Sequence, residues 1–114
     1  MTLDNFFRQL DRLLTMSQII IDRPKGSLHP RFADIIYPLD YGYLEGTNSG
    51  DGDGVDVWLG TQEGEPQIVA VLVTVDAYKR DTEVKLLVNC TDEDIQTVLG
   101  FHETNEIGCH LIRR

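Results

Sequence analysis

Two long apolar runs, joined by a short charged connection, do most to limit the fold of this chain. Residues 65–78 read EPQIVAVLVTVDAY and residues 82–90 read TEVKLLVNC, with KRDT at the junction. Both runs are rich in β-branched residues, which favour strands. Shorter runs of the same kind predict further strands at SQIIID (17–22), ADIIYP (33–38), YGYLEG (41–46) and GVDVWLG (54–60).

Helical patterns lie on either side of these strands. Leu3, Phe6, Phe7 and Leu10 begin a helical spacing that predicts an amphipathic helix over residues 3–16. Thr91, acids in the next turn and apolar residues at helical spacing predict a capped helix in TDEDIQTVLGFHETN (91–105), and IGCHLIRR predicts an edge strand. We therefore expect one domain over 1–114: the helix at 3–16, a barrel core at about 18–90, and a C-terminal helix and strand at 91–114. The fold class is mainly β with flanking helices (α+β by content), as a small barrel or strongly curved sheet.

The charge balance limits the kind of partner. The 114 residues carry 19 acidic and 10 basic side chains, a formal net charge of −9. This field repels nucleic acid and anionic membranes, so we expect neither as a partner, and it suits metal cations. Charged residues interrupt the N-terminal apolar segment, which is unlike a signal peptide, so a cytoplasmic location is the default expectation.

Three aspartates, Asp51, Asp53 and Asp56, stand close together in the glycine-rich stretch SGDGDGVD. A solvated acidic turn explains the glycines but leaves Asp56 inside an apolar strand, where a carboxylate needs a partner. A calcium loop is a second reading, since Ser49 and the first two aspartates fit its spacing, but the closing glutamate would fall at Gly60. The third reading is a magnesium site for phosphoryl transfer, because hard divalent cations bind clustered carboxylates.

The wider sequence favours the third reading. The segments IIIDRP, YPLDYGYLEGT, DGDGVDVWLG and VDAYKRDTEVKLLV, in this order, resemble the family I soluble inorganic pyrophosphatases over about residues 18–88. The resemblance implies a small OB-like β-barrel. It also implies hydrolysis of inorganic pyrophosphate to two phosphates by metal-activated water, with two or more Mg²⁺ ions, or with Mn²⁺ or another divalent cation.

The resemblance also implies roles for particular residues. Asp53 would be the catalytic base as well as a metal ligand, and Tyr41 would be catalytic. Glu83 is slightly favoured over Asp81 as the last ligand, because it shares a strand face with Lys85. We read His29 and His102 as non-catalytic. The implied metal ligands are Asp22, Asp51, Asp53, Asp56, Asp76 and either Asp81 or Glu83, and the implied substrate-binding residues are Arg31, Lys85, Tyr37 and Lys25.

The chain also departs from the family pattern. Between Arg31 and Tyr37 it lacks a hairpin's worth of residues with a phosphate-binding arginine, and its C-terminal segment has no tyrosine–lysine pair. Alternatives therefore stay open: hydrolysis of another phosphoanhydride, a non-catalytic protein that binds Mg²⁺ or phosphate, or a structural acidic barrel. We expect pyrophosphate or a similar small phosphoanhydride as the partner molecule, and a homo-oligomer formed through the Phe6, Phe7 and Leu10 face.

Overall fold

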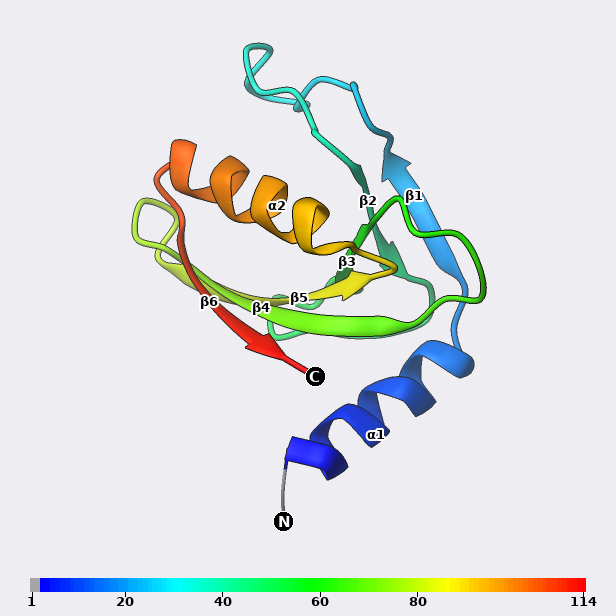
Figure 1. The fold of residues 1–114 in the computed structure, drawn as a ribbon. Helices are drawn as coiled ribbons and strands as arrows, with labels where there is room; N and C mark the ends of the chain where they lie inside the picture. Colours follow the sequence, from blue (N-terminus) through cyan, green and yellow to red (C-terminus); the bar gives the residue numbers. More distant parts are fainter. Residues whose placement is uncertain (1–2) are drawn as a thin grey trace.

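The computed structural model describes residues 3–114 as one curved sheet with a helix on each side (Figure 1). The strands pair in the order β1-β2-β3-β5-β4-β6, and every pair is antiparallel except the parallel pair of β3 with β5. The elements are α1 (Leu3–Thr15), β1 (Ile19–Arg23), β2 (Asp40–Leu44), β3 (Val55–Leu59), β4 (Ile68–Asp76), β5 (Asp81–Val88), α2 (Asp92–Thr104) and β6 (Gly108–Arg113).

The predicted fold class is confirmed, but the barrel is not closed. The described pairings end at β1 on one edge and at β6 on the other, and β1 and β2 rise steeply from the plane of β4 and β6 (Figure 1). Each face of the sheet is covered by its own helix instead of by the sheet folding back on itself. The strand predicted at the C-terminal end, residues 107–114, is the edge strand β6, as expected.

The strand predicted at residues 33–38 does not form. Residues 24–39 make an excursion from the sheet that contains one isolated bridge, between Leu28 and Ile36. Pro24, Pro30 and Pro38 stand along this segment and lack the N–H groups that a strand ladder needs. The segment therefore remains irregular, at the top of Figure 1.

Two apolar cores form because neighbouring residues of a strand point to opposite faces. Trp58 and Leu87 belong to the core beneath α2, whereas Val57 and Leu86 belong to the core that packs against α1. In α1, Phe7 is 3% exposed and lies in this second core. Much of the face that we expected to bind another copy of the chain is thus used within the chain.

The start of α2 is built as the sequence predicts. Thr91 is the N-cap, its hydroxyl accepts from the Asp94 N–H at 3.0 Å, and the Asp94 carboxylate accepts from the Thr91 N–H at 3.0 Å. The same carboxylate accepts from the backbone N–H and the hydroxyl of Thr61. This capping box fixes α2 to the loop after β3, and so over one end of the sheet.

A glycine explains why β1 and β2 can lie so close together. A Cβ on Gly42 would meet the carbonyl oxygen of Ile20 at 1.8 Å, well inside contact distance. Only glycine therefore permits this pairing, which carries Tyr41 and Arg23 to the same place on the sheet.

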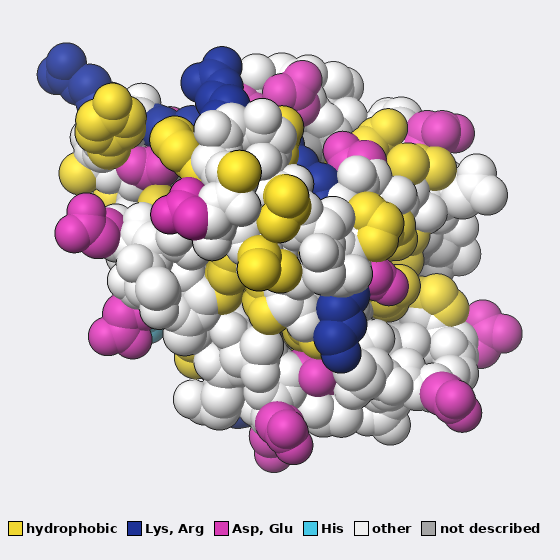
Figure 2. All heavy atoms as spheres, turned by 90° about the horizontal axis from the view of Figure 1, so that it is seen from above, with side chains coloured by type: hydrophobic (Ala, Val, Ile, Leu, Met, Phe, Trp, Pro, Cys, Tyr) yellow, Lys and Arg dark blue, Asp and Glu magenta, His cyan; other side chains and the backbone are white. Residues whose placement is uncertain are grey.

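One face of the molecule carries acidic, basic and apolar side chains in separate groups (Figure 2). Seen from the top of Figure 1, acidic side chains surround exposed hydrophobic groups, and Lys and Arg stand in separate places (Figure 2). Within residues 3–114, no helix is long and apolar enough to cross a membrane.

Candidate active site

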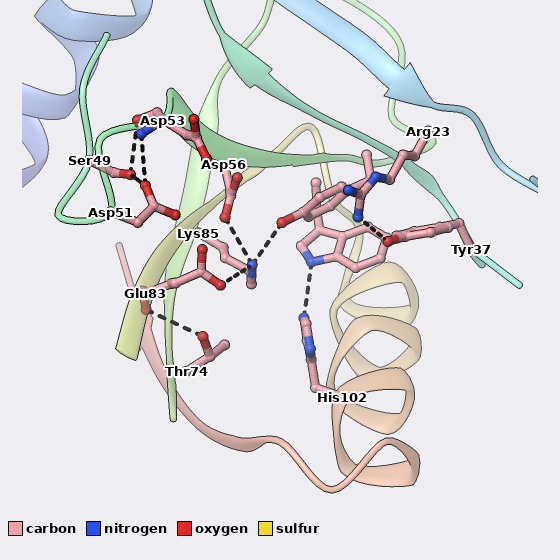
Figure 3. Close-up of polar contacts among 12 residues, drawn as sticks. Arg23, Tyr37, Ser49, Asp51, Asp53, Asp56, Thr74, Glu83, Lys85 and His102 are labelled. Carbon is pink, nitrogen blue, oxygen red and sulfur yellow. Dashed lines mark hydrogen bonds and ion pairs between the residues drawn. The ribbon is translucent and has the colours of Figure 1, made fainter. Parts of the chain in front are cut away.

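A buried lysine joins three of the predicted site residues. Lys85 on β5 is 5% exposed and lies directly across from Asp56 on β3, because the two strands pair in parallel. Its Nζ lies 2.7 Å from the Tyr41 hydroxyl, 3.0 Å from Asp56 Oδ2 and 3.4 Å from Glu83 Oε1 (Figure 3). The partner that Asp56 needs inside its apolar strand is therefore Lys85.

The electrostatics of this group favour a charged lysine. Burial disfavours the ammonium of Lys85, but Tyr41 and Asp56, and then Glu83, outweigh it and raise the pKa of Lys85. Burial also raises the pKa of the Tyr41 phenol. The pKa of Glu83 is raised by its burial and by the nearby Asp56 carboxylate, against the opposing effect of Lys85. The site thus holds one fixed cation, one neutral phenol and a carboxylate that accepts a proton more readily than usual.

The aspartate loop is ordered by its own hydrogen bonds. The Ser49 hydroxyl donates to Asp51 Oδ1 at 2.5 Å, and the Asp53 N–H donates to the same oxygen at 2.9 Å. These bonds lower the pKa of Asp51. Gly52 has a φ of +88°, which a residue with a side chain rarely adopts. The loop joins two strands, β2 and β3, so it lacks the flanking helices of a calcium-binding hand.

An arginine that the sequence prediction did not include completes the site. Arg23 on β1 donates through Nη1 to the Tyr37 hydroxyl at 2.5 Å, and its guanidinium carbon lies 5.6 Å and 5.9 Å from the ring centroids of Tyr37 and Tyr41. The register of β1 on β2 shifts between Ile21 and Arg23, which places Arg23 directly opposite Tyr41. Period-two alternation does not reveal such a bulge, so the only signal in the sequence was a charged residue next to Asp22.

The tyrosines sit on a buried aromatic layer. Tyr37 and Tyr41 stack with centroids 5.5 Å apart, and Tyr41 packs edge-on against Trp58 at 4.6 Å. His102 lies beneath, and its Nε2 accepts from the Trp58 indole N–H at 3.2 Å. Burial, with a smaller effect of Lys85, lowers the pKa of His102 to about 4, which keeps the ring neutral. His102 is thus a packing residue that holds Trp58, consistent with its reading as non-catalytic.

This arrangement of strands and helices occurs in solved proteins. The inorganic pyrophosphatase of Helicobacter pylori superposes with a TM-score of 0.63 over 86% of this chain and 85% of its own, at 18% sequence identity. An inorganic phosphatase from Anaplasma phagocytophilum gives a TM-score of 0.58 over 83% and 82% of the two chains, at 15% identity. The chain has the fold of an inorganic pyrophosphatase.

The sequences themselves have diverged much further than the fold. No family model matches the chain, and no curated protein matches it by sequence. The resemblance read from the four segments is therefore supported through the fold, which places the quoted motifs on β1, β2, β3 and the β4–β5 hairpin. Within this pyrophosphatase fold, the Lys85 group lies where β2, β3 and β5 run side by side.

Several of the predicted site residues lie apart from the Lys85 group. Asp76 accepts from the Lys79 N–H at 3.0 Å and pairs with Asp81 beside the β4–β5 turn. Asp22 is exposed at the bulge of β1, close enough to act on the charge of Arg23. Of the two alternatives for the last acid, Glu83 reaches Lys85, whereas Asp81 stands at the hairpin end.

The two other predicted cations belong to the excursion at residues 24–39. The side chains of Lys25 and Arg31 are exposed. The backbone N–H of Lys25 donates to Asp40, and the backbone N–H of Arg31 donates to His29. Their roles in substrate binding stay predictions. The cations that the described residues bring to the tyrosines are Lys85 and Arg23.

The acids have the right chemistry for Mg²⁺ but do not form the expected cage. Carboxylate oxygens are the ligands that Mg²⁺ prefers, and Glu83 lies beside both Asp56 and Asp51. Yet among residues 3–114 no three Asp, Glu, His or Cys side chains converge closely enough to hold a metal ion. Carboxylates repel one another. Here the Lys85 ammonium binds both Asp56 and Glu83 and offsets the repulsion between these two acids.

Proposed function

We propose that the protein hydrolyses a phosphoanhydride, inorganic pyrophosphate first of all, at the Lys85 group. The observation that carries the proposal is that one ammonium binds Tyr41, Asp56 and Glu83 together, on the fold of an inorganic pyrophosphatase. Tyr41, Asp56 and Lys85 come from three of the four sequence segments that carry the resemblance.

The chemistry assigned to these residues is attack of water on one phosphorus. The water oxygen forms a bond to phosphorus, the bridging P–O bond breaks, and its electron pair leaves with the second phosphate. The proton of the water passes to a carboxylate. The resemblance implies Asp53 as this base, and Glu83 is the alternative because its pKa is raised. The charge of Lys85 offsets the acids that would otherwise repel a diphosphate.

We include Mg²⁺ in the proposal as the metal, with other divalent cations as alternatives. The residues that would hold it are Glu83 and the two acids beside it, Asp51 and Asp56, and binding would require these three carboxylates to come closer together than they lie here. When bound, the ion would neutralise phosphate oxygens and activate the water.

A second candidate function is binding without catalysis. The pairing of the acids with Lys85, in place of a group of three that converges on one point, favours this alternative. Such a protein would bind phosphate or Mg²⁺ and release no product.

Phosphate release distinguishes the two functions. The purified protein is incubated with pyrophosphate, tripolyphosphate or ATP in Mg²⁺, beside an Asp56→Asn variant, which keeps the shape of the side chain and an acceptor for Lys85. Asp4→Asn, an exposed change on α1 far from the site, is the matched control. The proposal expects the wild type and Asp4→Asn to release phosphate, fastest from pyrophosphate. In Asp56→Asn the rate of release should fall by about 100-fold or more, as when other catalytic groups are removed. Equal rates in the wild type and Asp56→Asn would refute it.

A further inference from the structure

The ammonium of Lys85 has no donor left for a substrate. It carries three N–H groups and has three acceptors within reach, Tyr41, Asp56 and Glu83. Its side chain is also only 7% exposed. A diphosphate bound beside this group must therefore find its direct cationic contact elsewhere.

Arg23, unlike Lys85, has N–H groups that can still donate to a phosphate. A guanidinium has five N–H groups, and the hydrogen bond to the Tyr37 hydroxyl uses one nitrogen, Nη1. The side chain is half-buried, so part of it faces solvent. Guanidinium groups bind phosphate through parallel hydrogen bonds, which makes arginine well suited to a phosphoryl group.

The position of Arg23 is set before any ligand arrives. The bulge at Asp22 turns Arg23 to the face of Tyr41, and the rings of Tyr37 and Tyr41 lie beneath the guanidinium. Lys85 Nζ lies 5.1 Å from the centroid of the same Tyr41 ring. Figure 3 shows Arg23 and Lys85 apart, with aromatic rings between them. Each tyrosine hydroxyl accepts from a cation and so keeps its own O–H to donate.

We propose that Arg23 is the phosphate-binding cation of this site, and that it holds a diphosphate over Tyr37 and Tyr41 while Lys85 neutralises Asp56 and Glu83. This inference rests on the proposed function for the choice of a diphosphate as ligand. It differs from the prediction made from the sequence, in which Lys85, Arg31 and Lys25 supply the cations.

Binding of methylenediphosphonate, which resembles pyrophosphate but is not hydrolysed, tests the proposal directly. Calorimetry in Mg²⁺ compares the wild type with Arg23→Gln, Arg23→Lys and Arg12→Gln. Arg12 is exposed on α1, across the sheet from the site, so Arg12→Gln controls for the loss of one positive charge. Thermal unfolding of each variant confirms that the protein is folded.

Arg23→Gln is expected to weaken binding about 10-fold to 100-fold, as for the loss of a charge-assisted hydrogen bond, and Arg12→Gln to leave it unchanged. Arg23→Lys, which keeps the charge but not the planar fork, should fall between them. Tyr37→Phe removes the hydroxyl that positions Arg23 and should weaken binding by a smaller factor than Arg23→Gln.

The outcomes separate this inference from the proposed function. Equal affinities of Arg23→Gln and Arg12→Gln, both folded, would overturn the role of Arg23 even in a protein that hydrolyses pyrophosphate. Tight binding that Arg23→Gln weakens would support that role even in a protein that releases no phosphate. Absence of binding by the wild type would overturn the inference.

Discussion

Replacement of Lys85 by methionine should destabilise the protein through the acids that it leaves behind. Methionine keeps the apolar chain but removes the ammonium that binds Asp56 and Glu83. Breaking a fully buried ion pair costs about 3–5 kcal/mol. Here the side chains of Asp56 and Glu83 are 21% and 25% exposed and regain some water. We therefore expect a loss of about 2–3 kcal/mol in the free energy of unfolding.

The reasoning also predicts how this loss depends on a second change and on pH. In Lys85→Met the like charges of Asp56 and Glu83 face each other, so adding Glu83→Gln should restore about 1 kcal/mol. The folded pKa of Lys85 is raised above its unfolded value, so its contribution is fully present below about pH 10.5 and is lost as the pH rises through the folded pKa. The difference between Lys85→Met and wild type should therefore stay constant from about pH 6 to pH 9.

Urea denaturation of the wild type, Lys85→Met, Glu83→Gln and the double variant measures these terms as a double-mutant cycle. The exposed change Lys79→Met is the control and should lie within about 0.5 kcal/mol of wild type. A Lys85→Met variant as stable as Lys79→Met would refute the reasoning. So would a double variant no more stable than Lys85→Met alone.

Two further predictions concern the aromatic layer and the sheet. Because the folded pKa of His102, about 4, lies below the unfolded value, the stability that it contributes is full above about pH 6.5 and is lost as the pH falls toward 4. Unfolding free energies measured at pH 7 and pH 5 should differ by about 1–2 kcal/mol more in wild type than in His102→Gln, and equal pH dependences would contradict a buried neutral His102. Gly42→Ala should lower the free energy of unfolding by about 3 kcal/mol, because its Cβ would clash with the Ile20 carbonyl. Gly100→Ala in α2, where a Cβ meets nothing within 4 Å, should raise it by about 0.5–1 kcal/mol. Equal midpoints of urea unfolding for the two variants would contradict this account of Gly42.

The features that could be predicted from the sequence are those set by neighbouring residues. The capping box of Thr91 and Asp94 needs only a short segment, and the helix that it begins lies where the sequence predicts. That Asp56 needs a partner inside its apolar strand was predicted, but the partner expected from the resemblance was a metal ion, and the structure places Lys85 there.

The features that were not predicted depend on how distant segments pair. Closure of the sheet requires a ladder between its two edge strands, and no local pattern reports whether it forms. Arg23 was not among the substrate-binding residues predicted from the sequence, because the bulge that turns it toward Tyr41 arises only when β1 meets β2. Whether the acids converge on a metal site depends on which cations bind them. Lys85 binds Asp56 and Glu83, and no three acids of residues 3–114 form a metal site, which the spacing of the aspartates does not show.

The most direct test of the account is the initial rate of phosphate release from pyrophosphate, measured with Mg²⁺ and with chelator, for the wild type and for Asp53→Asn prepared in the same way. Asp53 lies in the exposed part of the aspartate loop, and its N–H bond to Asp51 is made by the backbone, so the variant should fold. The account predicts release by the wild type that requires Mg²⁺ and is lost in Asp53→Asn. No release by folded wild-type protein above that of Asp53→Asn would contradict it, and would leave a pyrophosphatase fold that binds without hydrolysis.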